Sequence, residues 1–197
     1  MEGLLGFVLA GFALIGSPGP ATLSLAATGA AFGARNGLRF MAGIVSGMVV
    51  VMILVAAGLT GLILALPGAT PIAAALAAAY MVYLGYRIAT APPLADLTHE
   101  QTRPSFAGGV LLAFANPKGW GAMTALFSGF VLIEGNLVLN AAVMVAILAS
   151  IMVVTDLSWL FVGSLLTRFF REPRLNRLIN VSFAVLLVAS VALTLLV

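Results

Sequence analysis

The feature that most constrains this chain is a long apolar run close to its start. No residue at positions 3–34 is charged. A helix of about 20 such residues spans the hydrocarbon core of a bilayer, so the run predicts a membrane span. Residues 17–20, with the sequence SPGP, interrupt it with residues that disfavour helix. A helix broken inside a bilayer needs a reason, because unsatisfied backbone groups are costly there.

The composition supports a membrane protein and excludes several functions. The chain is 62% hydrophobic and only 8% charged, whereas soluble domains are about 25% charged. The absence of cysteine removes thiol redox chemistry, disulfides and cysteine-ligated metals, and one histidine does not make a metal cluster. We therefore predict no metal site and no cofactor.

Hydropathy predicts an all-α integral membrane protein with six spans. The predicted spans are residues 4–28, 38–66, 71–88, 106–130, 137–165 and 178–197. The segment 90–105, with two adjacent prolines and a polar run, is predicted to be a flexible cytoplasmic connector. The short loops leave no room for a soluble catalytic domain, so residues 1–197 are predicted to form a single transmembrane domain.

The basic residues predict the orientation. Eight of the nine fall in the odd-numbered loops, namely Arg35, Arg39, Arg87, Arg103, Arg168, Arg171, Arg174 and Arg177. By the positive-inside bias these loops are cytoplasmic and both termini lie outside. The net charge of +3 thus reflects membrane orientation, and no nucleic-acid partner is predicted. The ninth basic residue, Lys118, is predicted to lie within a span.

A second interruption suggests an internal repeat. Ser17-Pro18-Gly19 and Asn116-Pro117-Lys118 are separated by 99 positions, half of the chain. Two halves of three spans each, about 1–98 and 99–197, must cross the membrane in opposite directions. Such inverted repeats are typical of secondary transporters, whose substrate sites lie near the bilayer midplane on discontinuous helices.

Each interruption carries the signature of a helix start. Ser and Asn are favoured N-caps, and Pro is favoured at the first helical position. Two helix N-termini meeting at the midplane would present free N–H groups and positive dipole ends to an anion. The predicted substrate-binding residues are Ser17, Pro18, Gly19, Pro20, Thr22, Asn116, Pro117, Lys118 and Trp120. Thr22 alternatively bonds back to a helix carbonyl.

Two charged side chains within spans are the strongest pointers to function. Lys118 follows the second interruption, and Asp156 is the only acid well inside a span. Intramembrane charges usually mark transport pathways. Asp156 is therefore predicted to carry protons or to bind an ammonium group, and the alternative is a structural ion pair with Lys118. Gly43 and Gly47, spaced as G-x-x-x-G, are interpreted as a helix-packing motif that is also compatible with a homodimer.

These motifs together resemble the LysE/RhtB family of amino-acid exporters. The resemblance rests on the SPGP interruption, the segment 80–87 (YMVYLGYR) and the segment 116–119 (NPKG), and it covers the whole chain in length and span order. It implies export of amino acids or close derivatives across the bacterial inner membrane, driven by protons. The substrate ammonium is then expected at Asp156 or at carbonyls near Ile15 and Phe114.

Four other functions agree less well with the sequence. A metal-ion exporter usually needs several acids, histidines or cysteines in the membrane. A thiol-redox carrier is excluded by the lack of cysteine. A membrane enzyme would need a triad or a metal constellation beside Asp156 and Lys118. A scaffold without transport activity leaves the intramembrane lysine unexplained.

Overall fold

The structure is a computed structural model with an all-helical fold. It describes residues 2–58, 72, 75, 79, 82, 83, 86, 89, 90, 104–165, 177, 178, 181, 182 and 185. The helices are α1 (Glu2–Gly16), α2 (Pro20–Phe32), α3 (Ala34–Ala56), α6 (Phe106–Ala115), α7 (Pro117–Gly129) and α8 (Leu137–Leu165). No strand occurs among the described residues. Most of the predicted third and sixth spans and of the connector lies outside them.

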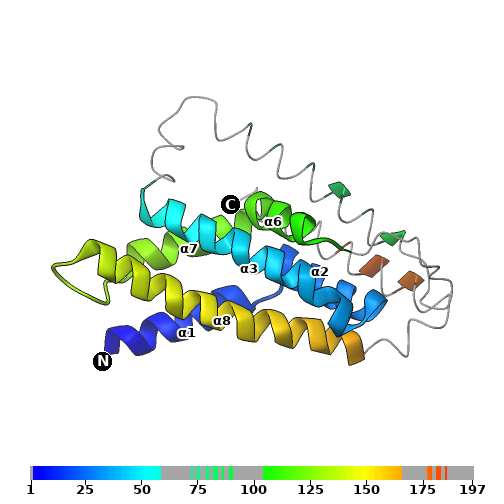
Figure 1. The fold of residues 1–197 in the computed structure, drawn as a ribbon, viewed down its shortest axis with the longest axis horizontal. Coiled ribbons are helices and arrows are strands. Elements are labelled where there is room, and N and C mark those ends of the chain that lie inside the picture. Colours follow the sequence, from blue (N-terminus) through cyan, green and yellow to red (C-terminus); the bar gives the residue numbers. More distant parts are fainter. Residues whose placement is uncertain are drawn as a thin grey trace.

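The helices run back and forth along the long axis of the bundle (Figure 1). The start of α1, the end of α3 and the turn between α7 and α8 lie at one end. The junction of α2 and α3, the start of α6 and the end of α8 lie at the other end. The described helices therefore cross the bundle between the same two ends, and the predicted topology of six spans stays a prediction.

Among the described residues, two helices meet by themselves the length and hydropathy expected of a membrane span. They are α3 and α8, and the start of α8 at Leu137 coincides with the start of the predicted fifth span. The pair α1 and α2 meets the criterion together, with a bend of 57° between its two parts. The predicted fourth span is divided into α6 and α7, which are separated only by Asn116.

The predicted end of the second span and the predicted extent of the first loop are wrong. The second span was predicted to reach residue 66, but α3 ends at Ala56 because Gly58 adopts a left-handed conformation with φ of 81°. Hydropathy missed this end because the sequence after Gly58 stays apolar. The first loop is reduced to Gly33 between α2 and α3, so Arg35 and Arg39 lie exposed on the first turns of α3.

Glycines bring helices from the two halves of the chain into backbone contact. A Cβ at Gly29 of α2 would collide with the carbonyl of Leu160 on α8, and a Cβ at Gly163 of α8 with that of Ala26. The crossing of α3 with α6 is equally tight, since a Cβ at Gly47 would lie 2.7 Å from the Cβ of Ala113. Small residues allow this approach in membrane helices. The packing interpretation of Gly43 and Gly47 is confirmed.

Candidate functional site

The first interruption is built around Gly19, not Ser17 as predicted. Gly19 is the N-cap of α2 and has extended backbone angles, φ −175° and ψ −175°. The residue before a proline avoids the helical region, so Pro20 moves the helix start past Pro18. The hydroxyl of Ser17 instead donates to the carbonyl of Leu14 at 3.0 Å. The N-cap prediction for Ser17 is therefore wrong.

Thr22 satisfies the backbone of the same interruption. Its Oγ1 accepts the N–H of Gly19 at 2.8 Å and lies 3.1 Å from the Gly19 carbonyl oxygen, to which it donates. This side chain therefore bonds back to the backbone, the second of its two predicted roles. A Thr three residues after the N-cap acts here as the Glu or Gln of a capping box does.

The second interruption follows the prediction closely. Asn116 is the N-cap of α7, and Pro117 occupies the first helical position. The Oδ1 of Asn116 accepts the N–H of Gly119 at 3.2 Å. The side chain of Asn116 is only 5% exposed, so this cap fixes the start of α7 inside the protein. Both interruptions thus leave a helix N-terminus within the bundle.

Two tryptophans satisfy carbonyls at the ends of the preceding helices. The indole Nε1 of Trp159 donates to the carbonyl of Gly16 at 3.0 Å, and that of Trp120 donates to Phe114 at 2.9 Å. Trp120 does not line the cavity described below, contrary to the prediction. The carbonyl of Phe114, one candidate partner for a substrate ammonium, is already engaged by Trp120. Sequence analysis missed these indole bonds.

Lys118 joins the two interruptions. Its Nζ donates to the carbonyl of Ser17 at 2.5 Å and to that of Pro18 at 3.3 Å. These carbonyls have lost their helical acceptor role because α1 ends at Gly16. The cation of the second half therefore satisfies backbone oxygens of the first half.

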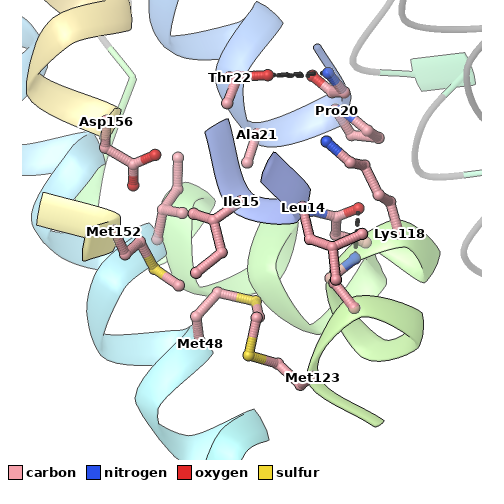
Figure 2. Close-up of a pocket in the computed structure, with 15 residues that line it drawn as sticks. Leu14, Ile15, Pro20, Ala21, Thr22, Met48, Lys118, Met123, Met152 and Asp156 are labelled. Carbon is pink, nitrogen blue, oxygen red and sulfur yellow. Dashed lines mark hydrogen bonds between the residues drawn. The ribbon is translucent and has the colours of Figure 1, made fainter. Parts of the chain in front are cut away.

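A cavity of about 40 Å³ lies between the two helix N-termini and α8. It is lined by Leu14, Ile15, Gly19, Pro20, Ala21, Thr22, Ile44, Met48, Asn116, Lys118, Gly119, Ala122, Met123, Met152 and Asp156. Asp156 and Lys118 approach it from opposite sides (Figure 2). Of the predicted substrate-binding residues, Ser17, Pro18, Pro117 and Trp120 lie outside the lining.

Asp156 is buried, and one of its carboxylate oxygens lacks a polar partner in the described part of the chain. It is 2% exposed, and its Oδ2 makes no hydrogen bond to any described residue. No ion pair joins it to Lys118 in this structure, because the Lys118 ammonium is directed to the carbonyls of Ser17 and Pro18. Buried polar groups are almost always satisfied, so an unpartnered carboxylate facing a cavity points to a ligand, a proton or water.

The electrostatics of the cavity are divided between its two sides. On one side lie the Lys118 ammonium and the first turns of α2 and α7, in which Ala21 and Lys118 carry backbone N–H groups that no helix carbonyl can accept. The other side holds the Asp156 carboxylate. The arrangement suits a small molecule with separated negative and positive groups.

Comparison with known proteins identifies the family of this chain. The protein-family model described as LysE type translocator matches residues 12–197 of the chain. The chain belongs to this family. The match confirms the resemblance found in the sequence and assigns this multi-pass membrane protein to a family of solute transporters. No curated protein and no solved structure matches.

The described part of this LysE type translocator offers no metal centre. No group of three or more His, Cys, Asp or Glu side chains gathers among the described residues. The ionisable side chains that line the cavity are Lys118 and Asp156, which can bind charged groups or exchange a proton.

Gly19 offers a selective test of Lys118 in this translocator. A Cβ at Gly19 would lie 2.6 Å from Cδ of Lys118, so Gly19→Ala must displace this flexible side chain while the backbone stays in place. We expect transport to fall at least about tenfold, because the charge-assisted hydrogen bonds from Lys118 to the carbonyls of Ser17 and Pro18 would be lost. Transport assays on vesicles, normalised to folded protein, measure this loss.

Gly16→Ala is the matched control for this experiment. Gly16 lies at the same interruption, but its added Cβ would meet only the Thr155 methyl group at 3.4 Å, an ordinary contact. We expect near-normal transport. Equal activity in both variants would show that the position of Lys118 does not matter for transport.

Proposed function

We propose that this translocator exports amino acids or close derivatives from the cytoplasm in exchange for protons. One observation carries the proposal: two helix N-termini, a lysine and an unpartnered buried aspartate face a single cavity. An amino acid brings one carboxylate and one ammonium, the two groups that this cavity complements.

The substrate carboxylate is proposed to bind at the helix starts. The first turns of α2 and α7 and the Lys118 ammonium provide positive potential and N–H donors on the same side of the cavity. The proposal includes a midplane position for this site, as in other transporters with discontinuous helices.

The substrate ammonium and the transported proton are proposed to compete for Asp156. A carboxylate that is 2% exposed and without a partner favours any bound cation or proton that neutralises it. Alternate loading of one site by substrate and proton produces antiport when the empty site does not switch between the two sides of the membrane, and the proposal includes this condition.

Alternating access is proposed to arise from rocking of the two halves, 1–98 and 99–197, around this site. The helix contacts support the repeat. α3 packs on α6 as α8 packs on α1, and α2 packs on α8 as α7 packs on α3. Each contact in these pairs corresponds to the other when the two halves are exchanged, whereas the packing of α2 on α3 has no counterpart of similar extent between α7 and α8. The two tryptophan bonds, one at each interruption, fit the same scheme.

Everted membrane vesicles provide the test. With an acidic interior reported by a quenched dye, an exported amino acid added outside should enter the vesicles, release protons and restore fluorescence. Lys118→Ala vesicles, prepared with equal amounts of folded protein, should respond weakly. The cytoplasmic assignment of the odd-numbered loops can be checked independently by single-cysteine labelling, because the natural chain contains no cysteine.

The outcomes separate the remaining functions. A response to a divalent metal salt and not to amino acids would favour a metal exporter, against the sparse ligands among the described residues. A response to neither, from folded protein, would favour another solute, another coupling ion or a non-transporting scaffold. A normal response from Lys118→Ala would remove the proposed role of the lysine.

A further inference from the structure

We propose that the cavity selects amino acids with uncharged aliphatic or thioether side chains, which lie against a methionine wall formed by Met48, Met123 and Met152. This inference rests on the proposed amino-acid export and names its substrate class. The three residues come from α3, α7 and α8, and all are at most 3% exposed. Three of the eight methionines in the chain thus line one small cavity.

The wall lies on one side of the cavity and the polar groups lie elsewhere around it (Figure 2). Met48, Met123 and Met152 gather below Ile15, whereas Thr22, Lys118 and Asp156 surround the upper part of the view. Ile44 adds a further apolar side chain to the lining. An amino acid whose backbone groups reach Lys118 and Asp156 therefore directs its side chain to thioethers and methyl groups.

Charge selection follows from the number of charged groups present. Among the described residues, only Lys118 and Asp156 bring charge to the cavity lining. The backbone carboxylate and ammonium of the substrate engage both of them. A second charge, as in lysine or glutamate, would enter an apolar surrounding without a partner, which is strongly unfavourable.

The use of methionine has a consequence for the shape of the substrate. The cavity of about 40 Å³ has space for a few water molecules, and methionine side chains form one side of it. Methionine has flexible, unbranched and polarisable side chains that adapt to different ligand shapes. We expect norleucine, methionine and leucine to bind comparably, and a small side chain such as that of alanine to bind weakly.

Isothermal titration calorimetry on the purified full chain in detergent tests this directly, because binding needs no coupling ion. The ligands are norleucine, methionine, leucine, alanine, lysine and glutamate. We expect norleucine to bind at least about tenfold more tightly than alanine, since each buried methylene contributes to affinity. Lysine is isosteric with norleucine apart from its terminal ammonium, and we expect it to bind more weakly still.

A pair of variants tests the wall itself. Met123→Ala should weaken norleucine binding and leave alanine binding unchanged, because only the longer side chain reaches this residue. Met41→Ala is the control, since Met41 packs on the core from α3 without lining the cavity. The wild-type ligand series remains decisive if Met123→Ala does not fold.

The results distinguish the two proposals. Tight binding of lysine or glutamate, or equal binding of alanine and norleucine, would overturn the aliphatic preference and leave amino-acid export standing. Failure of every amino acid to bind folded protein would overturn both. Equal loss of norleucine affinity in the Met123→Ala and Met41→Ala variants would assign the effect to packing and overturn the methionine wall.

Discussion

Asp156→Asn is expected to abolish proton movement in the vesicle assay without lowering the thermal stability of the protein. The substitution keeps the size of the side chain and removes its ability to carry a charge or release a proton. An unsatisfied buried group costs about 1–3 kcal/mol, and more when it is charged. Asp156 is buried and its Oδ2 has no partner among the described residues. Neutralising this carboxylate therefore removes no hydrogen bond of its Oδ2 from the folded state.

Glu134→Gln is the matched control. Glu134 is an exposed acid in the turn between α7 and α8, so its neutralisation should leave both transport and stability unchanged. For both variants, transport is measured by substrate-induced fluorescence recovery in vesicles and stability by thermal unfolding in detergent. A drop in melting temperature for Asp156→Asn would assign Asp156 a structural role. Unchanged proton release would exclude it as the proton-coupling group.

Gly163→Ala is expected to lower the free energy of unfolding strongly. The added methyl group would collide with the backbone of Ala26, lying 2.7 Å from its Cα. Backbone atoms cannot relieve this collision by a change of rotamer, as a side chain could. Helices α2 and α8 must then separate. Overpacking of this kind costs about 1–3 kcal/mol and occasionally more. Thermal unfolding of the detergent-purified protein, followed by the loss of monodisperse material, measures the effect.

Gly121→Ala makes the same chemical change where no contact opposes it. Gly121 lies within α7, and an added Cβ would meet nothing within 4 Å. Alanine stabilises a helix interior by about 0.5–1 kcal/mol relative to glycine, so this variant should unfold at a slightly higher temperature. Equal destabilisation by both substitutions would mean that the close crossing of α2 and α8 does not contribute to stability.

Local chemistry in the sequence was sufficient to predict several parts of the fold. Hydropathy predicted the start of α8 because polar residues of the preceding turn lie next to it. The Asn-Pro pair gave the start of α7, since the cap and the first helical residue are both set by near neighbours. The interruption between α1 and α2 was predicted for the same reason. The inverted repeat and the membrane midplane stay predictions.

Features that depend on distant partners escaped prediction. The partners of Lys118 lie about a hundred positions away, at Ser17 and Pro18, and no local pattern indicates that a lysine satisfies them. The methionine wall escaped for a similar reason. Met48, Met123 and Met152 are scattered along the chain, and their common location depends on how α3, α7 and α8 pack. The N-cap prediction for Ser17 was wrong because either Pro18 or Pro20 could occupy the first helical position, and α2 begins at Pro20.

The position of Lys118 has a consequence for how tightly this protein can hold its cargo. In the structure its ammonium already has acceptors, the carbonyls of Ser17 and Pro18. A substrate carboxylate that binds as proposed must therefore compete with an internal ligand that is always present at high effective concentration. Such competition weakens binding and hastens release. For the proposed exporter this is an advantage, because slow release of the substrate on the outer side would limit the rate of transport.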